Sequence, residues 1–186
     1  MEIPQKIYLK LRPLILPINE IVKWTPDNAC ILDLGCGKGV ITNYLKNFNQ
    51  YLGVDMTVPI RNDEKNINFI QSDCTNFIKK DISKFDTFMI IDLLHHLPKK
   101  KQMSFLENII LKMKHEDMLI LKDIYPRNFI TKFWNFLHDF LISKQIINYF
   151  DFVNFEKNLK FNCKIIKKYH KRIFLYDHYF LILKKL

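Results

Sequence analysis

All four glycines of this chain lie within nineteen residues, and this clustering constrains the fold more than any other feature of the sequence. They are Gly35, Gly37, Gly39 and Gly53, in a chain of 186 residues. Three of them alternate directly after the apolar run Cys30–Leu34. Glycine is the residue that a tight turn or a close approach of backbone to a ligand requires. The pattern predicts a strand that leads through a glycine loop into a helix.

The spacing of this loop distinguishes it from two common phosphate-binding loops. It is GxGxG, whereas dinucleotide enzymes have GxGxxG. Lys38 is followed by Gly39 and Val40, so the GK[ST] ending of a P-loop is absent. A lone glycine loop is weak evidence, and its meaning depends on the strands around it.

Short apolar runs alternate with helical patterns through residues 28–125, which indicates a parallel sheet covered on both faces. The predicted strands are Cys30–Leu34, Tyr51–Val54, Ile67–Ile70, Phe85–Ile91 and Met118–Leu121. The predicted helices are Ile18–Lys23, Val40–Lys46, Lys99–Met113 and Phe129–Ile142, while residues 146–161 are ambiguous. Asn162–Lys168 and His178–Leu183 are predicted as final strands, which should pair antiparallel because their connection is short.

Acidic residues follow several of these strands, at the edge of the sheet where α/β proteins bind ligands. Asp55 lies 20 residues after Gly35, a distance at which an acid can accept hydrogen bonds from both hydroxyls of a ribose. Asp73 closes the third run and can accept from an exocyclic amino group, while the Cys74 N–H can serve a ring nitrogen. Asp33, before the loop, can hold the turn or approach a ligand amine. Together these positions favour an adenosine-containing ligand.

At this point the sequence resembles the class I S-adenosylmethionine-dependent methyltransferases, over roughly residues 28–125. The segments that carry the resemblance are Ile31–Gly39, Asp55, Asp73-Cys74, Phe85–Pro98 and Met118–Tyr125. The resemblance implies an enzyme with S-adenosyl-L-methionine as cofactor. It implies an α/β, Rossmann-like doubly wound fold, with a mostly parallel seven-stranded sheet, an antiparallel last strand and helices on both faces. The implied cofactor-binding residues are Asp33, Gly35, Cys36, Gly37, Asp55, Met56, Asp73, Cys74 and Asp92.

Two features depart from the family pattern. Met56–Asn66 is short and contains Pro59, so the usual second helix should be truncated or missing. The Asn/Asp-Pro-Pro-aromatic signature of many amino-group methylases is absent, which argues against N-methylation of a nucleobase. We expect a single domain over residues 1–186, with an N-terminal helical cap (1–27), a cofactor-binding half (28–125) and a substrate-side part (126–186).

Methyl transfer to a hydroxyl needs a group that removes a proton. The catalytic candidates are, in order, His95, Asp123, Tyr125 and His138, although histidines such as His95 and His96 in this motif class also cap the next helix or pack. The histidines show no metal-ligand spacing, and we expect no metal.

The formal charge of +10 lies entirely in residues 99–186, since residues 1–98 carry equal numbers of acidic and basic residues. This half also carries most of the aromatic residues, and Pro126–Ser143 resembles small methyltransferases linked with aryl-polyene, polyketide-like or lipid-conjugate synthesis. We expect a small-molecule or lipid-linked acceptor, most simply O-methylated. The wide aromatic face of the predicted Phe129–Ile142 helix could cover an apolar acceptor, lie on a membrane surface, or serve only to cover the sheet. Three alternatives remain open: an RNA or protein methyltransferase that grips its target with the basic half, a non-catalytic cofactor-binding protein, and lysines enriched only by codon bias.

Two general features bound these expectations. No apolar run approaches the roughly 18–20 residues that span a bilayer. The four cysteines are scattered and form no CxxC pair, which favours free thiols in a reducing compartment. We therefore expect a cytoplasmic protein, and the sequence leaves its oligomeric state open.

Overall fold

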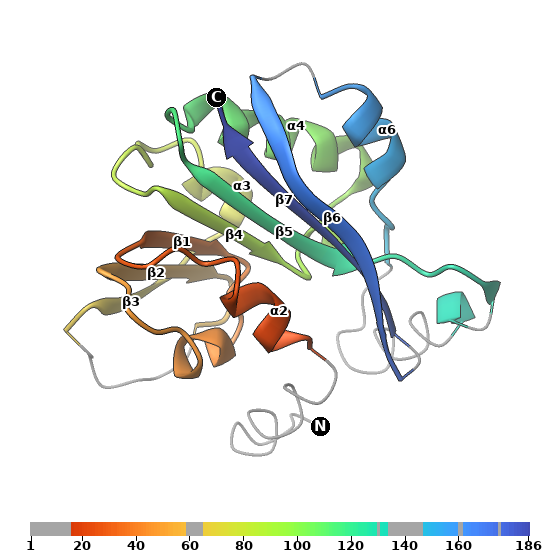
Figure 1. Cartoon of the computed structure of the whole chain (residues 1–186), viewed down its shortest axis with the longest axis horizontal. Coiled ribbons are helices and arrows are strands. Elements are labelled where there is room, and N and C mark those ends of the chain that lie inside the picture. The colour runs from red at the N-terminus through yellow and green to blue at the C-terminus, as the bar shows by residue number, and fades with distance from the viewer. Residues whose placement is uncertain (1–15, 59–64, 130, 134–146, 160–161, 175) are drawn as a thin grey trace.

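The computed structural model describes residues 16–58, 65–129, 131–133, 147–159, 162–174 and 176–186. Within them a single mixed sheet of seven strands has the order β3-β2-β1-β4-β5-β7-β6 (Figure 1). The strands are β1 (Cys30–Leu34), β2 (Gln50–Asp55), β3 (Ile67–Gln71), β4 (Thr87–Ile91), β5 (Met118–Ile124), β6 (Cys163–Ile173) and β7 (Tyr176–Lys185). The helices are α2 (Ile18–Val22), α3 (Cys74–Phe77), α4 (Lys99–Lys112) and α6 (Phe152–Lys157), with 3-10 turns η1 (Val40–Asn43) and η2 (Leu94–His96).

The strand pairing confirms the predicted Rossmann-like, mostly parallel sheet. β1 to β5 pair in parallel, and β1 and β4 are neighbours at the centre although β2 and β3 intervene in sequence. β7 runs antiparallel between β5 and β6, so the predicted antiparallel pairing of the last two strands is confirmed. Both strands are longer than predicted. The carboxyl ends of β1, β2, β4 and β5 therefore lie along one edge of the sheet, where ligands of such folds bind.

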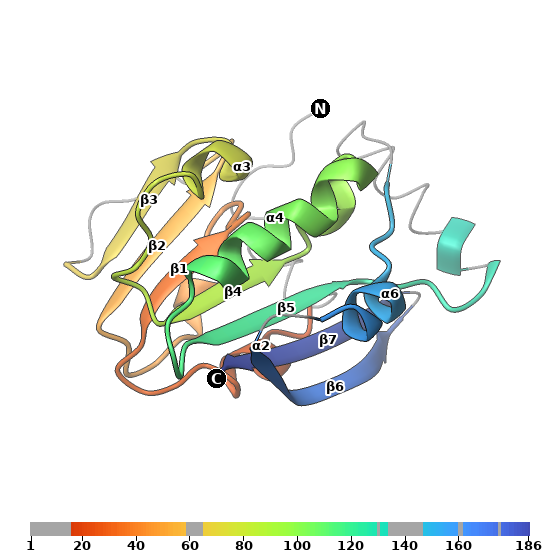
Figure 2. The ribbon, with the colours of Figure 1, turned by 90° about the horizontal axis from the view of Figure 1, so that it is seen from above.

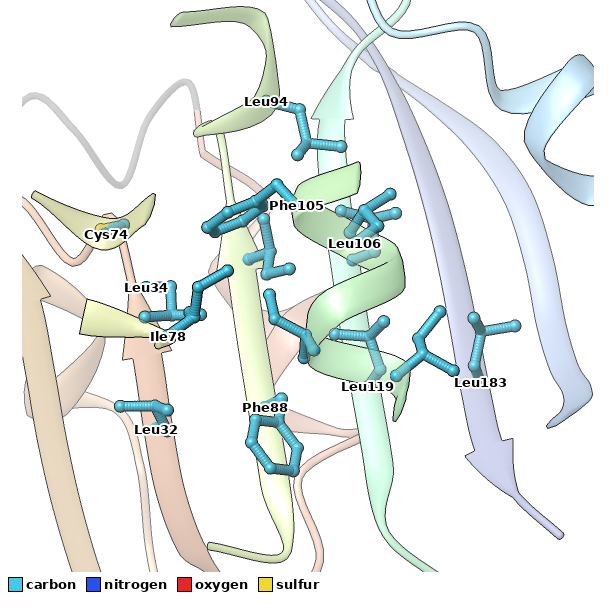
Figure 3. Packing of buried hydrophobic residues seen from close by; sticks show 14 of the residues in the cluster. Leu32, Leu34, Cys74, Ile78, Phe88, Leu94, Phe105, Leu106, Leu119 and Leu183 are labelled. Carbon is cyan, nitrogen blue, oxygen red and sulfur yellow. The ribbon is translucent and has the colours of Figure 1, made fainter. Parts of the chain in front are cut away.

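Helical elements lie on both faces of the sheet (Figure 2), and each face has its own hydrophobic core. α3, α4 and α6 cover one face, and α4 contributes Phe105, Leu106 and Ile109 at helical spacing. Figure 3 shows Phe105 and Leu106 packed over Leu34, Phe88 and Leu119 of the central strands. The other face is covered by α2 and η1, so helical elements lie on both faces as predicted.

One predicted helix is wrong. Val40–Lys46 is not an α-helix, because only the 3-10 turn Val40–Asn43 forms after Gly39. Gly39 is left-handed at its start, and Asn47 is left-handed beyond its end. The residues after the turn run back to β2, where the Asn49 N–H donates to the Ala29 carbonyl at 2.9 Å.

Several other predictions fall partly outside the described residues. The predicted helix Phe129–Ile142 is helical at Phe129 and at 131–133, and His138 and the rest of it lie outside. So do residues 1–15 of the expected N-terminal cap and 59–64 of the expected truncated helix. Part of the ambiguous stretch 146–161 is helix α6. Among the described helices, none has the length and apolarity to cross a membrane.

Candidate active site

The glycine loop is held against β2 by its own backbone. Gly35, Gly37 and Gly39 all have positive φ angles, of 82°, 53° and 65°, a region that side chains disfavour. The N–H groups of Gly35 and Cys36 both donate to the carbonyl of Val54, at 2.8 and 3.3 Å. The loop therefore bends tightly across the carboxyl end of β2, as the spacing of its glycines predicted.

Asp55, the last residue of β2, is joined to this loop. One oxygen of its carboxylate accepts from the Gly37 N–H at 3.0 Å, and the other accepts from the Thr57 N–H at 2.8 Å. Both oxygens have further acceptor capacity, since a carboxylate offers about four lone-pair sites. Met56, which follows, is 61% exposed at the rim of the loop.

Close packing around Gly53 requires a glycine at this position. A Cβ atom on Gly53 would lie 2.7 Å from Sγ of Cys36 and 2.7 Å from the ring of Phe69. The Cys36 thiol thus packs against the backbone of β2, and burial raises its pKa far above the usual range. The side chain of Cys36 is therefore an unreactive packing group, and only the backbone of this residue is available to a ligand at the glycine loop.

Asp73 and Cys74 lie at the start of α3, next to β2. Asp73 is the N-cap of this helix, and its Oδ1 accepts from the Asn76 N–H at 2.9 Å and from the hydroxyl of Thr75. The Thr75 hydroxyl is the main reason that the pKa of Asp73 is lowered. Burial raises the pKa of the Cys74 thiol to about 12, and its Sγ lies 3.4 Å from the Val54 carbonyl.

Asp33 is a buried carboxyl with one unsatisfied oxygen. It lies on β1, is 3% exposed, and accepts a hydrogen bond from the Tyr51 hydroxyl at 2.5 Å through Oδ2. Its Oδ1 is buried without a hydrogen-bond partner in the described structure. Burial raises the pKa of Asp33 to about 7; the Tyr51 hydroxyl opposes this shift and the negative charge of Asp55 adds to it. A buried acceptor of this kind is costly unless a ligand supplies its donor.

Asp92, at the end of β4, pairs with a buried lysine that sequence reasoning missed. Nζ of Lys122 lies 2.5 Å from Oδ1 of Asp92, and Lys122 has no exposed surface. Asp92 itself has a φ of 53°, and its N–H donates to the Lys122 carbonyl at 2.9 Å. A single lysine inside the apolar run of β5 is the signal that could have revealed it, because buried lysines are almost always paired.

His95 and Asp123 meet in the interior at the carboxyl ends of β4 and β5. Nδ1 of His95 contacts Oδ1 of Asp123 in a very short hydrogen bond, and the His95 N–H donates to Oδ2 at 3.2 Å. The two residues are 3% and 0% exposed. Asp123 is held in turn by the Ile124 N–H at 2.7 Å. Two of the three first-named catalytic candidates are thus brought together.

A buried glutamine fixes the turn that carries His95. Nε2 of Gln102 on α4 donates to the carbonyls of Leu94 at 2.8 Å and Asn148 at 2.5 Å. The Asn148 N–H donates in turn to the His95 carbonyl at 2.9 Å. Sequence reasoning missed Gln102, although a polar residue among the apolar positions of α4 marks it.

Tyr125 lies two residues beyond Asp123, in a group of aromatic rings. Its ring centroid is 5.9 Å from Tyr179, 5.4 Å from His170 and 6.1 Å from Phe152. Tyr179 is the register partner of Asp123, so the side chains of these two residues lie on the same face of the sheet. The fourth catalytic candidate, His138, lies outside the described residues.

Asp92, His95 and Asp123 also form a group that could hold a metal ion. Each offers a ligand atom, and these atoms lie within 4.8 Å of one another. The ammonium group of Lys122, however, already contacts Asp92 and supplies positive charge there. The observed contacts favour an ion-paired and hydrogen-bonded cluster over a metal centre.

Comparisons with known proteins agree with this arrangement. Residues 31–115, a little under half of the chain, match the family model described as a methyltransferase domain. No curated protein matches the chain in sequence.

Solved structures resemble the whole fold at low sequence identity. Magnesium protoporphyrin IX methyltransferase from Synechocystis PCC 6803, with S-adenosylhomocysteine bound, has a TM-score of 0.64 and 14% identity over 91% of this chain and 82% of its own. A Burkholderia thailandensis 1,6-didemethyltoxoflavin-N1-methyltransferase, also with S-adenosylhomocysteine, has a TM-score of 0.70 and 13% identity over 94% and 77%. An S-adenosylmethionine-dependent methyltransferase from Methanosarcina mazei has a TM-score of 0.63 and 19% identity over 100% and 99%.

A strand, a glycine loop and an acid one strand later lie in a mostly parallel seven-stranded sheet. Residues 31–115 match a methyltransferase domain, and the fold is the one seen in S-adenosylmethionine-dependent methyltransferases of solved structure. The domain that matches the family model contains the glycine loop and runs through β4 and α4, while β5 to β7 complete the sheet.

Proposed function

We propose that this chain is a class I S-adenosylmethionine-dependent methyltransferase. It would methylate an oxygen atom of a small-molecule or lipid-linked acceptor, with His95 as the general base. The observation that supports this most directly is the buried His95–Asp123 pair at the carboxyl ends of β4 and β5. Since a carboxylate can only accept, Asp123 favours the tautomer with the proton on Nδ1. Nε2 then carries the basic lone pair of the ring.

The residues around the glycine loop fit the cofactor. Asp55 is suited to the ribose hydroxyls, because its carboxylate ends β2 beside the loop. The buried Oδ1 of Asp33 lacks a donor, and the ammonium group of the cofactor's methionine part would supply one. Gly35, Cys36 and Gly37 would present backbone to the ligand. The remaining proposed contacts with the cofactor come from residues along the same edge of the sheet: Met56, Asp73, Cys74 and Asp92.

The chemistry divides between cofactor and protein. When bound, the cofactor supplies a methyl group on a sulfonium, which an aligned nucleophile can take by direct displacement. The acceptor hydroxyl gives its proton to Nε2 of His95 as the new O–C bond forms, and Asp123 stabilises the resulting imidazolium. An amine that is already neutral needs no such base. The pair therefore favours an oxygen acceptor over a nitrogen acceptor.

Incubation with methyl-labelled cofactor and fractionated extract tests the acceptor class. We expect label in the lipid or small-metabolite fraction. We expect His95→Gln and Asp123→Asn to reduce methyl transfer by about 10²–10⁴-fold while affinity for S-adenosylhomocysteine stays within a few-fold, the range for loss of a general base. His96→Gln, which removes the exposed neighbouring imidazole, is the matched control. Full activity of His95→Gln in a folded protein would exclude His95 as the base.

One observation favours an RNA or protein acceptor as a second candidate. β6 is an edge strand, and Lys164, Lys167 and Lys168 are exposed along it. Such a row of cations suits an acidic target, although arginine is the usual residue for bidentate phosphate contacts and is scarce here. Label in the RNA or protein fraction, with binding that weakens as salt rises, would favour this candidate.

A further inference from the structure

Three of the most exposed large hydrophobic side chains lie near the hairpin of β6 and β7. Phe129 is 80% exposed, Phe133 is 56% exposed, and Phe174, at the turn of the hairpin, is 75% exposed. Phenylalanine side chains at such exposure are costly in water, and a group of them marks an interaction surface.

Asp177 joins the two segments that carry these rings. The Tyr125 N–H donates to its carbonyl at 2.8 Å, and the Arg127 N–H donates to its Oδ2 at 3.1 Å. Nε of Arg172 lies 3.4 Å from its Oδ1. Figures 1 and 2 both show the segment after β5 and the turn between β6 and β7 at the same end of the molecule. We call Phe129, Phe133 and Phe174, with Arg127, Lys132 and Arg172, the aromatic–basic end.

The turn that carries Phe129 and Phe133 is anchored at Asn128. Asn128 caps this turn, because its Oδ1 accepts from the Thr131 N–H at 2.9 Å and its carbonyl accepts from the Lys132 N–H at 3.0 Å. Thr131 is fully buried, so the turn faces inward at this residue. The Tyr149 hydroxyl donates to the Lys132 carbonyl at 3.3 Å. Exposure of Phe129 and Phe133 is thus a feature of an anchored turn.

Among the described residues of this end, the exposed charges are positive. Arg127, Lys132 and Arg172 are exposed, while Asp177 is 3% exposed and is held by the backbone and Arg172. Phenylalanines ringed by cations are the composition of a surface that lies in the headgroup region of an anionic bilayer. An acidic protein surface would match the charges and leave the rings without an apolar environment. Unpaired RNA bases can stack on such rings, so RNA binding is an outcome that the experiment below separates from docking on lipid.

The aromatic–basic end lies next to Asp123, the partner of the proposed base His95, in the sequence and in the strand register. Arg127 follows the carboxyl end of β5, four residues after Asp123, and Tyr179 of β7 is the register partner of Asp123. We propose that the aromatic–basic end docks on an anionic lipid surface, with the phenylalanines in the interface, so that the acceptor is a lipid-linked molecule taken from that surface. This inference rests on the proposed function for the identity of the acceptor.

Flotation of the full chain with vesicles tests the docking. We expect the protein to bind vesicles of phosphatidylcholine with about 30% phosphatidylglycerol and to bind pure phosphatidylcholine at least about tenfold more weakly. The double variant Phe129→Ser/Phe174→Ser should lower binding by about tenfold or more, since it removes two interfacial rings. Leu111→Ser is the matched control, because Leu111 is 65% exposed at the end of α4, near the amino end of β5.

The outcomes separate this inference from the proposed function. Equal flotation of the double variant and the parent protein would overturn the docking, and so would the absence of vesicle binding. Binding of a single-stranded RNA that is unaffected by the double substitution, without vesicle binding, would assign the cations to nucleic acid instead. Calorimetry with S-adenosylhomocysteine and label transfer to a soluble metabolite report on the proposed function alone. An active protein that ignores vesicles would thus refute only the docking.

Discussion

Cofactor binding should be coupled to ionisation of Asp33. In the ligand-free protein this carboxyl is buried, one oxygen lacks a donor, and its pKa is raised to about 7. The groups that face it are the Tyr51 hydroxyl and the Asp55 carboxylate from β2 and the Cys36 thiol from the glycine loop. An ammonium group bound at Oδ1 would favour the carboxylate form, so we expect binding to release a proton.

The expected change in cofactor affinity with pH follows from the pKa of Asp33. If only the ionised form binds well, the apparent affinity scales with the ionised fraction, which is about one half at pH 7 and about 3% at pH 5.5. Affinity should therefore fall by about 15-fold between these two pH values. The ligand's own α-amino group stays charged throughout, since such groups have pKa values near 7.7–8.0.

Isothermal titration with S-adenosylhomocysteine measures this directly. Titrations between pH 5.5 and 7, in two buffers of different ionisation enthalpy, give both the affinity and the number of protons released. We expect nearly one proton released at pH 5.5 and about one half at pH 7. Asp33→Asn should bind more weakly at pH 7 and should lose the pH dependence. Constant affinity across this range, or an unchanged slope in the Asn variant, would refute the coupling.

The raised pKa of Asp33 also predicts that ionisation of this carboxyl lowers the free energy of unfolding when no ligand is bound. The pKa of Asp33 in the folded protein lies above the ordinary value of 3.8, so the folded protein binds this proton more tightly than the unfolded chain does. The protonated Asp33 contributes its full stabilisation below about pH 3.8. As pH rises toward 7, the free energy of unfolding falls by up to about 4 kcal/mol because this carboxyl ionises. In urea at pH 8, Asp33→Asn should be more stable than the parent protein, and the difference should narrow at pH 5.

Four further substitutions or treatments test other parts of the structure. Asp55→Ala should weaken binding of S-adenosylhomocysteine by about 1.5–3 kcal/mol, the scale of hydrogen bonds to a charged group, and calorimetry showing unchanged affinity in a folded protein would remove the ribose assignment. Gly53→Ala should lower the free energy of unfolding by about 1–3 kcal/mol, because its Cβ would meet Cys36 and Phe69; an unchanged urea midpoint would contradict that packing. A chelator should change methyl transfer by less than about twofold, because Lys122 already supplies a cation at Asp92, and a loss restored by Mg²⁺ or Mn²⁺ would show a metal centre. The pKa of Glu20 is lowered to about 2, chiefly by Lys171, so the stabilisation from this carboxylate is present above the ordinary value of 4.5 and is lost as pH falls toward 2. Glu20→Gln should therefore cost about 1 kcal/mol at pH 7, and a cost that persists at pH 2 would rule out the ion pair as its origin.

The parts of the fold that the sequence predicted are those with a strong local signal. β1 is predicted at its observed bounds because a continuous apolar run ends at a glycine, and α4 because its buried residues recur at helical spacing. The predicted Val40–Lys46 helix fails because the apolar spacing there is also satisfied by a short turn, and the choice depends on where the chain must rejoin β2.

The residues of the candidate site could likewise be predicted only where the sequence carries a local signal. His95 and Asp123 could be named from their places after β4 and β5, yet their contact across 28 residues follows only from the strand order. Lys122 and Gln102 were missed because polar residues inside apolar elements look like exposed positions until burial is known. Tyr51, the partner of Asp33, has no local sign that distinguishes it from an ordinary core tyrosine.

β7 follows β6 in sequence, yet in the sheet it lies between β5 and β6 and carries the register partner of Asp123. It covers the hydrogen-bonding edge of β5 and contributes buried side chains to both hydrophobic cores. A chain cut before β7 would leave that edge and both cores open to water, so it should aggregate instead of folding.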